Sequence, residues 1–211
     1  MNRPWFLYAG SLSQCVPIVA AVVHRRRPRG ARGWILAWLA LLLLADGIAL
    51  YLGRQHLNNR WVSYAFTPLQ ALAVLWAMSL WQRGTVARLA IRNSIPLVLV
   101  VVVGMSFLED TQSFSRYTEP ILSMVALIVA VYTVASRSAA TSDPLLRQDW
   151  FFIGIGVGLA YGATAALTPL AFAFARSNPE LVNRAYFVRM IAHVLAMISI
   201  SLGMLCPTPP E

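Results

Sequence analysis

The segment LLLLADGIALYLG (41–53) carries one aspartate, Asp46, in an otherwise apolar run. No other charged residue lies within seven positions of Asp46. A carboxylate at the centre of a membrane span costs about 2.5–3.5 kcal/mol, and less towards the interface, so a partner must offset that cost. We therefore expect Asp46 to face the interior of a helix bundle. Its expected partners are His193 and Gln70, with Arg189 about one turn from His193.

Further polar side chains lie at similar depths in other apolar runs. Counted from the nearest end of each run, Asp46 and His193 lie roughly 10 Å deep, and Gln14 and Gln70 roughly 13 Å. The opposite halves of the runs carry almost nothing polar beyond serine. Polar groups within spans usually face the bundle interior and mark a site. The sequence thus predicts a ligand-binding site made by Asp46, His193, Gln70, Gln14, Thr168 and Arg189. A self-satisfied network that only locks the helices together is the alternative.

The residue types exclude several kinds of chemistry. A retinal Schiff base requires lysine, and all 17 basic residues are arginine. A structural zinc site needs four ligands and a catalytic one three, whereas Asp46 and His193 supply two. Bis-histidine haem needs a second intramembrane histidine, so His193 could only be a single axial ligand to a pigment. No nucleophile pattern is evident, so we expect no catalytic residue, no cofactor and no metal site.

These polar side chains lie among seven apolar runs of about twenty residues, each long enough to cross a membrane as a helix. The chain has 211 residues, of which 58% are hydrophobic and 12% charged, and a mean hydropathy of +0.63. This composition predicts one all-α membrane domain, 1–211, of seven helices. In the fourth run, Ser94 is the expected N-cap. The predicted spans are 5–24, 34–53, 61–81, 94–110, 119–136, 150–174 and 187–206.

Arginine placement predicts the orientation, because cytoplasmic loops carry an excess of basic residues. Ten of the 17 arginines fall on the side of the first loop, HRRRPRGARG (24–33). We therefore expect the N-terminus outside and the C-terminus inside, so the polar layer would lie in the outer half. Arginines between apolar runs favour contact with the bilayer and its anionic lipid headgroups rather than with nucleic acid. The arginines of the first loop are Arg25, Arg26, Arg27, Arg29 and Arg32.

Two sequence patterns concern helix packing. In DWFFIGIGVGLAYG (149–162), Gly154, Gly158 and Gly162 recur every fourth position, which predicts a bare stripe for close helix packing. A phosphate loop does not fit, because that motif needs a preceding strand. Separately, NRWVSYAFTPLQALA (59–73) resembles NRAYFVRMIAHVLA (183–196), which predicts a 3+1+3 pseudo-repeat.

Several motifs are shared with a group of small bacterial seven-helix proteins of unknown function. They are Ser13-Gln14-x-x-Pro17 with the arginine cluster, Asn59-x-Trp61, an acid or amide at Gln70, Asp149-Trp150-Phe151-Phe152, and His193. The chain resembles these proteins over most of its length, and it is loosely similar to the seven-helix modules of some bacterial sensors. The resemblance implies a multi-pass protein of the bacterial cytoplasmic membrane. Where such proteins often carry glutamate, this chain has the uncharged Gln70.

These observations favour an integral membrane protein that binds a small or amphipathic ligand in an outer polar cavity, as a sensor or binding module. Signal output would then require a separate membrane protein partner. A small-molecule transporter of the 3+1+3 type is the first alternative. The second is a structural or assembly subunit of a larger membrane complex, which would dock through the glycine stripe and the basic first loop.

Overall fold

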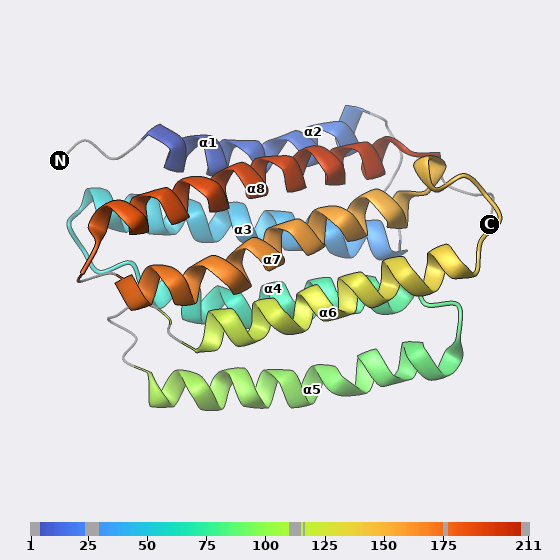
Figure 1. The fold of residues 1–211 in the computed structure, drawn as a ribbon, viewed down its shortest axis with the longest axis horizontal. Coiled ribbons are helices and arrows are strands. Elements are labelled where there is room, and N and C mark those ends of the chain that lie inside the picture. Colours follow the sequence, from blue (N-terminus) through green and yellow to red (C-terminus); the bar gives the residue numbers. More distant parts are fainter. Residues whose placement is uncertain (1–4, 24–29, 110–114, 116, 175–176, 208–211) are drawn as a thin grey trace.

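A computed structural model describes residues 5–23, 30–109, 115, 117–174 and 177–207 (Figure 1). The described residues contain eight α-helices, one turn of 3-10 helix and no strand, so the all-α prediction is confirmed. The elements are α1 (Trp5–Ser13), α2 (Cys15–Val23), α3 (Gly30–Arg54), α4 (Trp61–Leu80), α5 (Thr85–Leu108), α6 (Thr118–Ala139), η1 (Leu145–Arg147), α7 (Asp149–Phe174) and α8 (Pro179–Leu205).

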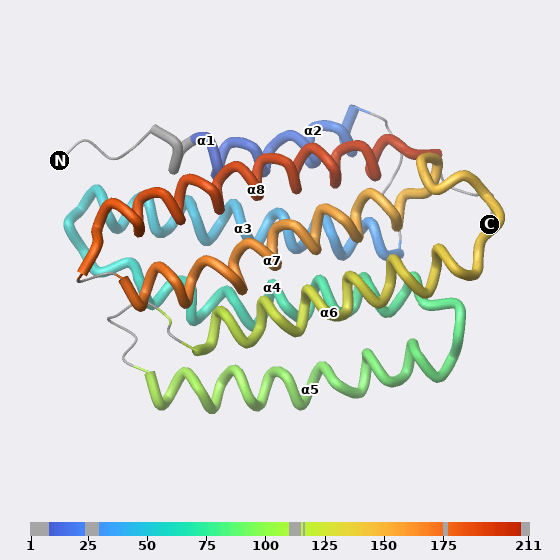
Figure 2. Tube along the Cα trace, in the orientation of Figure 1, coloured from blue at the N-terminus to red at the C-terminus, as the bar shows by residue number. Residues whose placement is uncertain are grey.

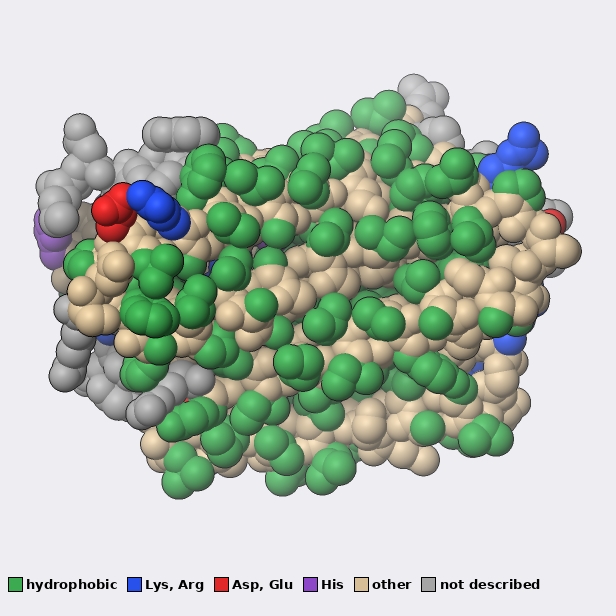
Figure 3. Space-filling view, viewed as in Figure 1, with side chains coloured by type: hydrophobic (Ala, Val, Ile, Leu, Met, Phe, Trp, Pro, Cys, Tyr) green, Lys and Arg blue, Asp and Glu red, His purple; other side chains and the backbone are tan. Residues whose placement is uncertain are grey.

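The helices run along the long axis of the molecule; α1 and α2 run in the same direction, and from α2 onward the helices alternate in direction (Figure 1). We call the end where α1 begins the N-terminal end. The connections from α3 to α4 and from α7 to α8 also lie there, whereas α8 ends at the opposite end (Figure 1). Six helices, α3 to α8, are long and apolar enough to cross a membrane, which confirms six of the seven predicted spans in outline. Hydrophobic side chains cover the visible face in its middle part (Figure 3). The charged side chains seen on this face lie at the two ends of the molecule (Figure 3).

The first predicted span is a shorter apolar stretch, Ala9–Val23, and it is broken at Gln14. The helices α1 and α2 follow one another along one line beside α8 (Figure 2). Pro17 explains the break, because proline has no N–H for the carbonyl four residues earlier and its ring clashes with that carbonyl. That carbonyl belongs to Ser13, the last residue of α1. The helix is therefore interrupted at Gln14, the residue between α1 and α2.

The predicted start of the fourth span is wrong. Helix α5 begins at Thr85, nine residues before the expected cap Ser94, and its N-cap residue is Gly84. Ser94 lies inside the helix, where its hydroxyl donates to the Ile91 carbonyl at 2.8 Å. A serine in mid-helix commonly bonds back to the preceding turn in this way instead of capping.

The hydrophobic core fills the half of the bundle away from the N-terminal end. It contains the early turns of α3 and α7 and the late turns of α4 and α8, with Trp38, Trp150, Ile153, Met197 and Ile200 almost fully buried. The most extensive packing joins α7 to α8, followed by α7 to α6 and α3 to α4, while α5 lies at the edge against α4 and α6. The lack of polar groups noted in the sequence thus corresponds to a closely packed core.

An ion pair closes the opposite end of the bundle. Arg32 on α3 donates through Nε to Asp149 Oδ2 at 2.8 Å and through a terminal nitrogen to the Cys206 carbonyl at 3.0 Å. The Arg32 side chain is only 8% exposed. It therefore contacts other residues of the protein instead of the lipid headgroups that the sequence led us to expect. Arg25, Arg26, Arg27 and Arg29 lie outside the described residues.

At the N-terminal end, Glu109 fastens the end of α5 to the start of α6. Its carboxylate accepts hydrogen bonds from the backbone N–H groups of Tyr117 and Thr118 and from the hydroxyls of Ser115 and Thr118. Burial alone would raise the pKa of Glu109, but these hydrogen bonds outweigh it and hold the pKa below its ordinary value. The ionised carboxylate is therefore the form that this connection favours.

The glycine stripe lies against α6. A Cβ atom built on Gly154 would come within 2.5 Å of Val134, whereas Gly158 and Gly162 have only Leu127 nearby, at 3.9 and 3.4 Å. The tightest approach to backbone is elsewhere, between α7 and α8. There a Cβ on Gly156 would lie 2.8 Å from the Ala196 carbonyl oxygen, and one on Gly203 3.0 Å from that of Asp149.

Candidate functional site

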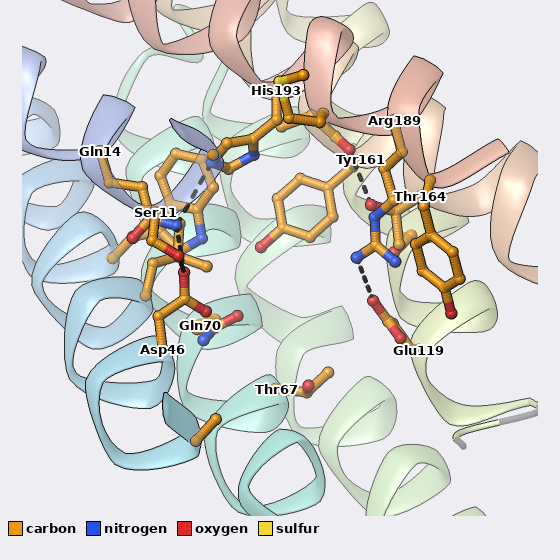
Figure 4. Close-up of a pocket in the computed structure, with 18 of the residues that line it drawn as sticks. Ser11, Gln14, Asp46, Thr67, Gln70, Glu119, Tyr161, Thr164, Arg189 and His193 are labelled. Atoms are coloured by element: carbon orange, nitrogen blue, oxygen red, sulfur yellow. Dashed lines mark hydrogen bonds and ion pairs between the residues drawn. The ribbon is translucent and has the colours of Figure 1, made fainter. Parts of the chain in front are cut away.

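A cavity of about 430 Å³ lies in the half of the bundle towards the N-terminal end (Figure 4). This volume is within the range of small-molecule sites, roughly 300–1,000 Å³. Residues of α1, α3, α4, α6, α7 and α8 line it, together with Gln14 at the break between α1 and α2. Its polar lining consists of Ser11, Gln14, Asp46, Asn59, Thr67, Gln70, Ser123, Glu119, Tyr161, Thr164, Tyr186, Arg189 and His193.

Asp46 reaches the cavity from one face of α3. Trp38, Leu42 and Asp46 all line it, and their spacing of four residues places them on the same side of the helix. Asp46 Oδ2 accepts a hydrogen bond from the Ser11 hydroxyl at 2.6 Å and another from Gln14 Nε2 at 3.0 Å. Both bonds end on the same oxygen, and among the described residues no donor reaches Oδ1.

The break after α1 is what directs Gln14 inward. Its side chain is 3% exposed, and its Nε2 lies 3.0 Å from Asp46 Oδ2 and 3.4 Å from His193 Nε2. A carboxylate can only accept, so the amide nitrogen must face Asp46 and the amide oxygen must point away. Since Gln14 then donates to His193 as well, we assign the His193 proton to Nδ1 and a neutral ring. The Gln14 Oε1 atom is buried and has no hydrogen-bond partner.

Two aromatic side chains form another part of the wall. Trp38 and Tyr161 stack with ring centroids 5.8 Å apart and an interplanar angle of 25°. The indole N–H of Trp38 and the hydroxyl of Tyr161 are buried and interact with each other, and neither makes a hydrogen bond with any other described residue. Native proteins leave few buried polar groups unpaired, so Gln14 Oε1 and the Tyr161 O–H, both at one cavity, require an explanation.

Arg189 joins three helices beside the cavity. It donates to Glu119 Oε1 of α6 at 2.6 Å (Figure 4). It also donates to the Thr168 hydroxyl of α7 at 3.3 Å. The Arg189 and Glu119 side chains are 32% and 26% exposed, so the pair is partly buried. Glu119 is thus the carboxylate in contact with Arg189, whereas Asp46 interacts with the guanidinium only at longer range.

The structure brings most of the predicted site residues together. Asp46, His193, Gln70, Gln14 and Arg189 all line the cavity, and Thr168 lies next to it as a partner of Arg189. The expected partner of Asp46 is different, however: Ser11 and Gln14 bind it, and His193 is one step further along the network. Sequence analysis missed Ser11, Trp38 and Tyr161, although Ser11 lies three residues before Gln14, one turn away on the same helical run.

The arrangement does not match hydrolytic chemistry. Ser11 donates its proton to Asp46 and not to His193, so the order of nucleophile, base and acid found in a catalytic triad is not formed. Among the described residues, no group of three or more histidine, cysteine, aspartate or glutamate side chains could hold a metal ion. The cavity instead offers hydrogen-bonding atoms of both kinds on a mostly apolar wall, which suits binding.

No protein-family model matches the chain, and neither a curated protein nor a solved structure is significantly similar to it.

Proposed function

We propose that this multi-pass membrane protein binds a small polar or amphipathic molecule in the cavity, as a sensor or ligand-binding module. The observation that supports this most strongly is the buried, unpaired Oε1 of Gln14 beside a cavity of about 430 Å³. A buried acceptor without a donor lowers the stability of the protein by about 1–3 kcal/mol, and a ligand that supplies the donor removes this penalty.

A network that only fixes helix register accounts less well for the same atoms. The hydrogen bonds among Ser11, Asp46, Gln14 and His193 do connect α1, α3 and α8. A purely structural network would be expected to satisfy its members and leave little space, because unpaired buried polar groups cost stability. Here Gln14 Oε1 remains unpaired and the space between the helices is open.

A transporter of the 3+1+3 type is the second candidate. Broken helices around a site are typical of transporters; the chain breaks between α1 and α2, just before Pro17, and α4 and α7 contain Pro68 and Pro169. Gln70 of the first repeat segment (59–73) and His193 of the second (183–196), which align when one residue of slippage is allowed, both line the cavity. Among the described residues, the core beyond the cavity is built mainly of closely packed hydrophobic side chains, which favours binding over transport.

The assembly role has less support. The glycine stripe was the expected docking surface, but Gly154, Gly158 and Gly162 lie against Val134 and Leu127 of the same chain. The stripe is therefore already covered by α6.

The orientation proposed here places the N-terminal end, and with it the cavity, on the outer side of the bacterial cytoplasmic membrane. With Cys15 and Cys206 replaced, Asn58→Cys should react with an impermeant thiol reagent in intact cells. Ser142→Cys, which is exposed at the opposite end, should react only after lysis. The reverse labelling pattern would place the cavity on the inner side.

Binding can be tested without knowing the ligand. Protein purified in mild detergent should release a bound molecule on denaturation, detected by mass spectrometry. Ala160→Phe and Thr67→Phe, which add bulk from two walls of the cavity, should release much less of it. Ala166→Phe, on the exposed side of α7, should retain it. Equal release from all four folded proteins would show that the molecule binds elsewhere, and release from none would contradict the proposed function.

A further inference from the structure

We infer that the ligand carries a protonated amine, which binds Asp46 and Gln14. This inference rests on the proposed function and concerns the chemistry of the same cavity. The first argument is charge. Among the described residues of the lining, the acids are Asp46 and Glu119 and the one arginine is Arg189, which is already paired with Glu119 at 2.6 Å. Because His193 is neutral in the assigned tautomer, no cation among these described lining residues contacts Asp46.

The second argument is the geometry of the acceptors. Asp46 and Gln14 are joined through Gln14 Nε2, so the atoms left over are Asp46 Oδ1 and Gln14 Oε1. Both are acceptors, and the amide cannot be flipped without directing its oxygen at a carboxylate. An ammonium group supplies several N–H donors with a positive charge, and charge-assisted hydrogen bonds are stronger than neutral ones. A neutral alcohol supplies one donor, and a carboxylate supplies none.

The third argument is the aromatic wall. Trp38 is two turns before Asp46 on the same face of α3 and stacks on Tyr161. Aromatic rings beside a carboxylate favour an organic cation, whose charge interacts with the ring face. A hydrated metal ion would need more oxygen or nitrogen ligands than this wall provides. Because the indole N–H of Trp38 can only donate, its interaction with Tyr161 leaves the Tyr161 O–H available to an acceptor elsewhere on the ligand.

Three probes of similar shape test this inference: 2-phenylethylamine, 2-phenylethanol and 3-phenylpropionate. Calorimetric titration of the detergent-solubilised protein at neutral pH should show the amine binding at least about tenfold more tightly than the other two. Ala160→Phe, titrated in parallel, corrects for partition of each probe into the micelle. This ranking needs no variant of Asp46 and so does not depend on how well such a variant folds.

Variants then locate the amine. Asp46→Asn should weaken amine binding at least about tenfold and change binding of the alcohol by less than about threefold. Glu180→Gln is the control, because it removes an exposed acid at the same end and should leave all three affinities unchanged. If Asp46→Asn retains full amine affinity, the assignment to Asp46 is wrong.

The outcomes separate this inference from the proposed function. Equal or tighter binding of the alcohol or the carboxylate would overturn the ammonium inference and leave ligand binding intact. If no probe binds, the molecule released from the native protein decides: a basic nitrogen in it supports the inference, and its absence overturns it. If no probe binds and nothing is released, both proposals fail.

Discussion

Replacing Arg32 with methionine is expected to lower the free energy of unfolding by about 3–5 kcal/mol. The change removes the ion-pair partner of Asp149 and leaves its carboxylate, which is 14% exposed, with Arg137 as a cation nearby but not in contact. It also removes the donor to the carbonyl of Cys206 at the end of α8. For a chain of this size the loss corresponds to a fall in melting temperature of about 10 °C.

A double variant isolates the pairing itself. Asp149→Asn in the Arg32→Met background removes the stranded charge, so the double variant should be more stable than Arg32→Met alone. The asparagine can still accept the hydrogen bond from its neighbour, the N–H of Trp150, which Asp149 Oδ1 now accepts at 2.7 Å. Melting curves of the single and double variants, recorded in the same detergent, measure this coupling.

An exposed ion pair provides the matched control. Arg184 and Glu180 are 2.6 Å apart, closer than Arg32 and Asp149, but their side chains are 74% and 75% exposed. Arg184→Met should therefore shift the melting temperature little, because exposed pairs contribute little to stability. Equal effects of Arg32→Met and Arg184→Met would show that burial does not set the strength of these contacts.

The sequence was sufficient for much of the fold because hydropathy and length report directly on spans. It failed where two local signals competed. Ser94 and Pro96 look like the start of a helix, but the apolar pattern before them already supports helix from Thr85, and Pro96 is tolerated inside α5. The contact between Arg32 and Asp149 joins residues 117 positions apart, and no local pattern can indicate such a pair.

The sequence predicts how deep each site residue lies along its helix, but not which way its side chain points. Counting residues from span ends correctly grouped Asp46, Gln70 and His193, because depth depends only on the helix rise. Which of them touch depends on helix rotation and on the break at Gln14, and these bring Ser11 and Gln14 to Asp46. Trp38 and Tyr161 were missed because aromatic residues in apolar runs usually pack in the core.

Gly156→Ala is expected to destabilise the protein by about 1–3 kcal/mol through overpacking. The added methyl carbon would lie 2.5 Å from Ile200 Cγ1 and 2.8 Å from the carbonyl oxygen of Ala196. The isoleucine side chain can rotate, but the carbonyl belongs to the backbone of α8 and can move only if the two helices separate. Because α7 and α8 pack along most of their length, that separation would disturb many contacts.

Gly158→Ala gives the opposite expectation two residues further along the same helix. A Cβ there would meet only Leu127 Cδ1, at the ordinary contact distance of 3.9 Å. Alanine is about 0.8–1.0 kcal/mol more favourable than glycine inside a helix, so this variant should be as stable as the native protein or more stable. Melting temperatures of the Gly156→Ala and Gly158→Ala variants, measured in the same detergent, test both expectations. If both variants lose the same stability, Gly158 is packed as tightly as Gly156, and contact with the α8 backbone is not what distinguishes Gly156. If neither loses stability, α7 and α8 are farther apart than the structure shows.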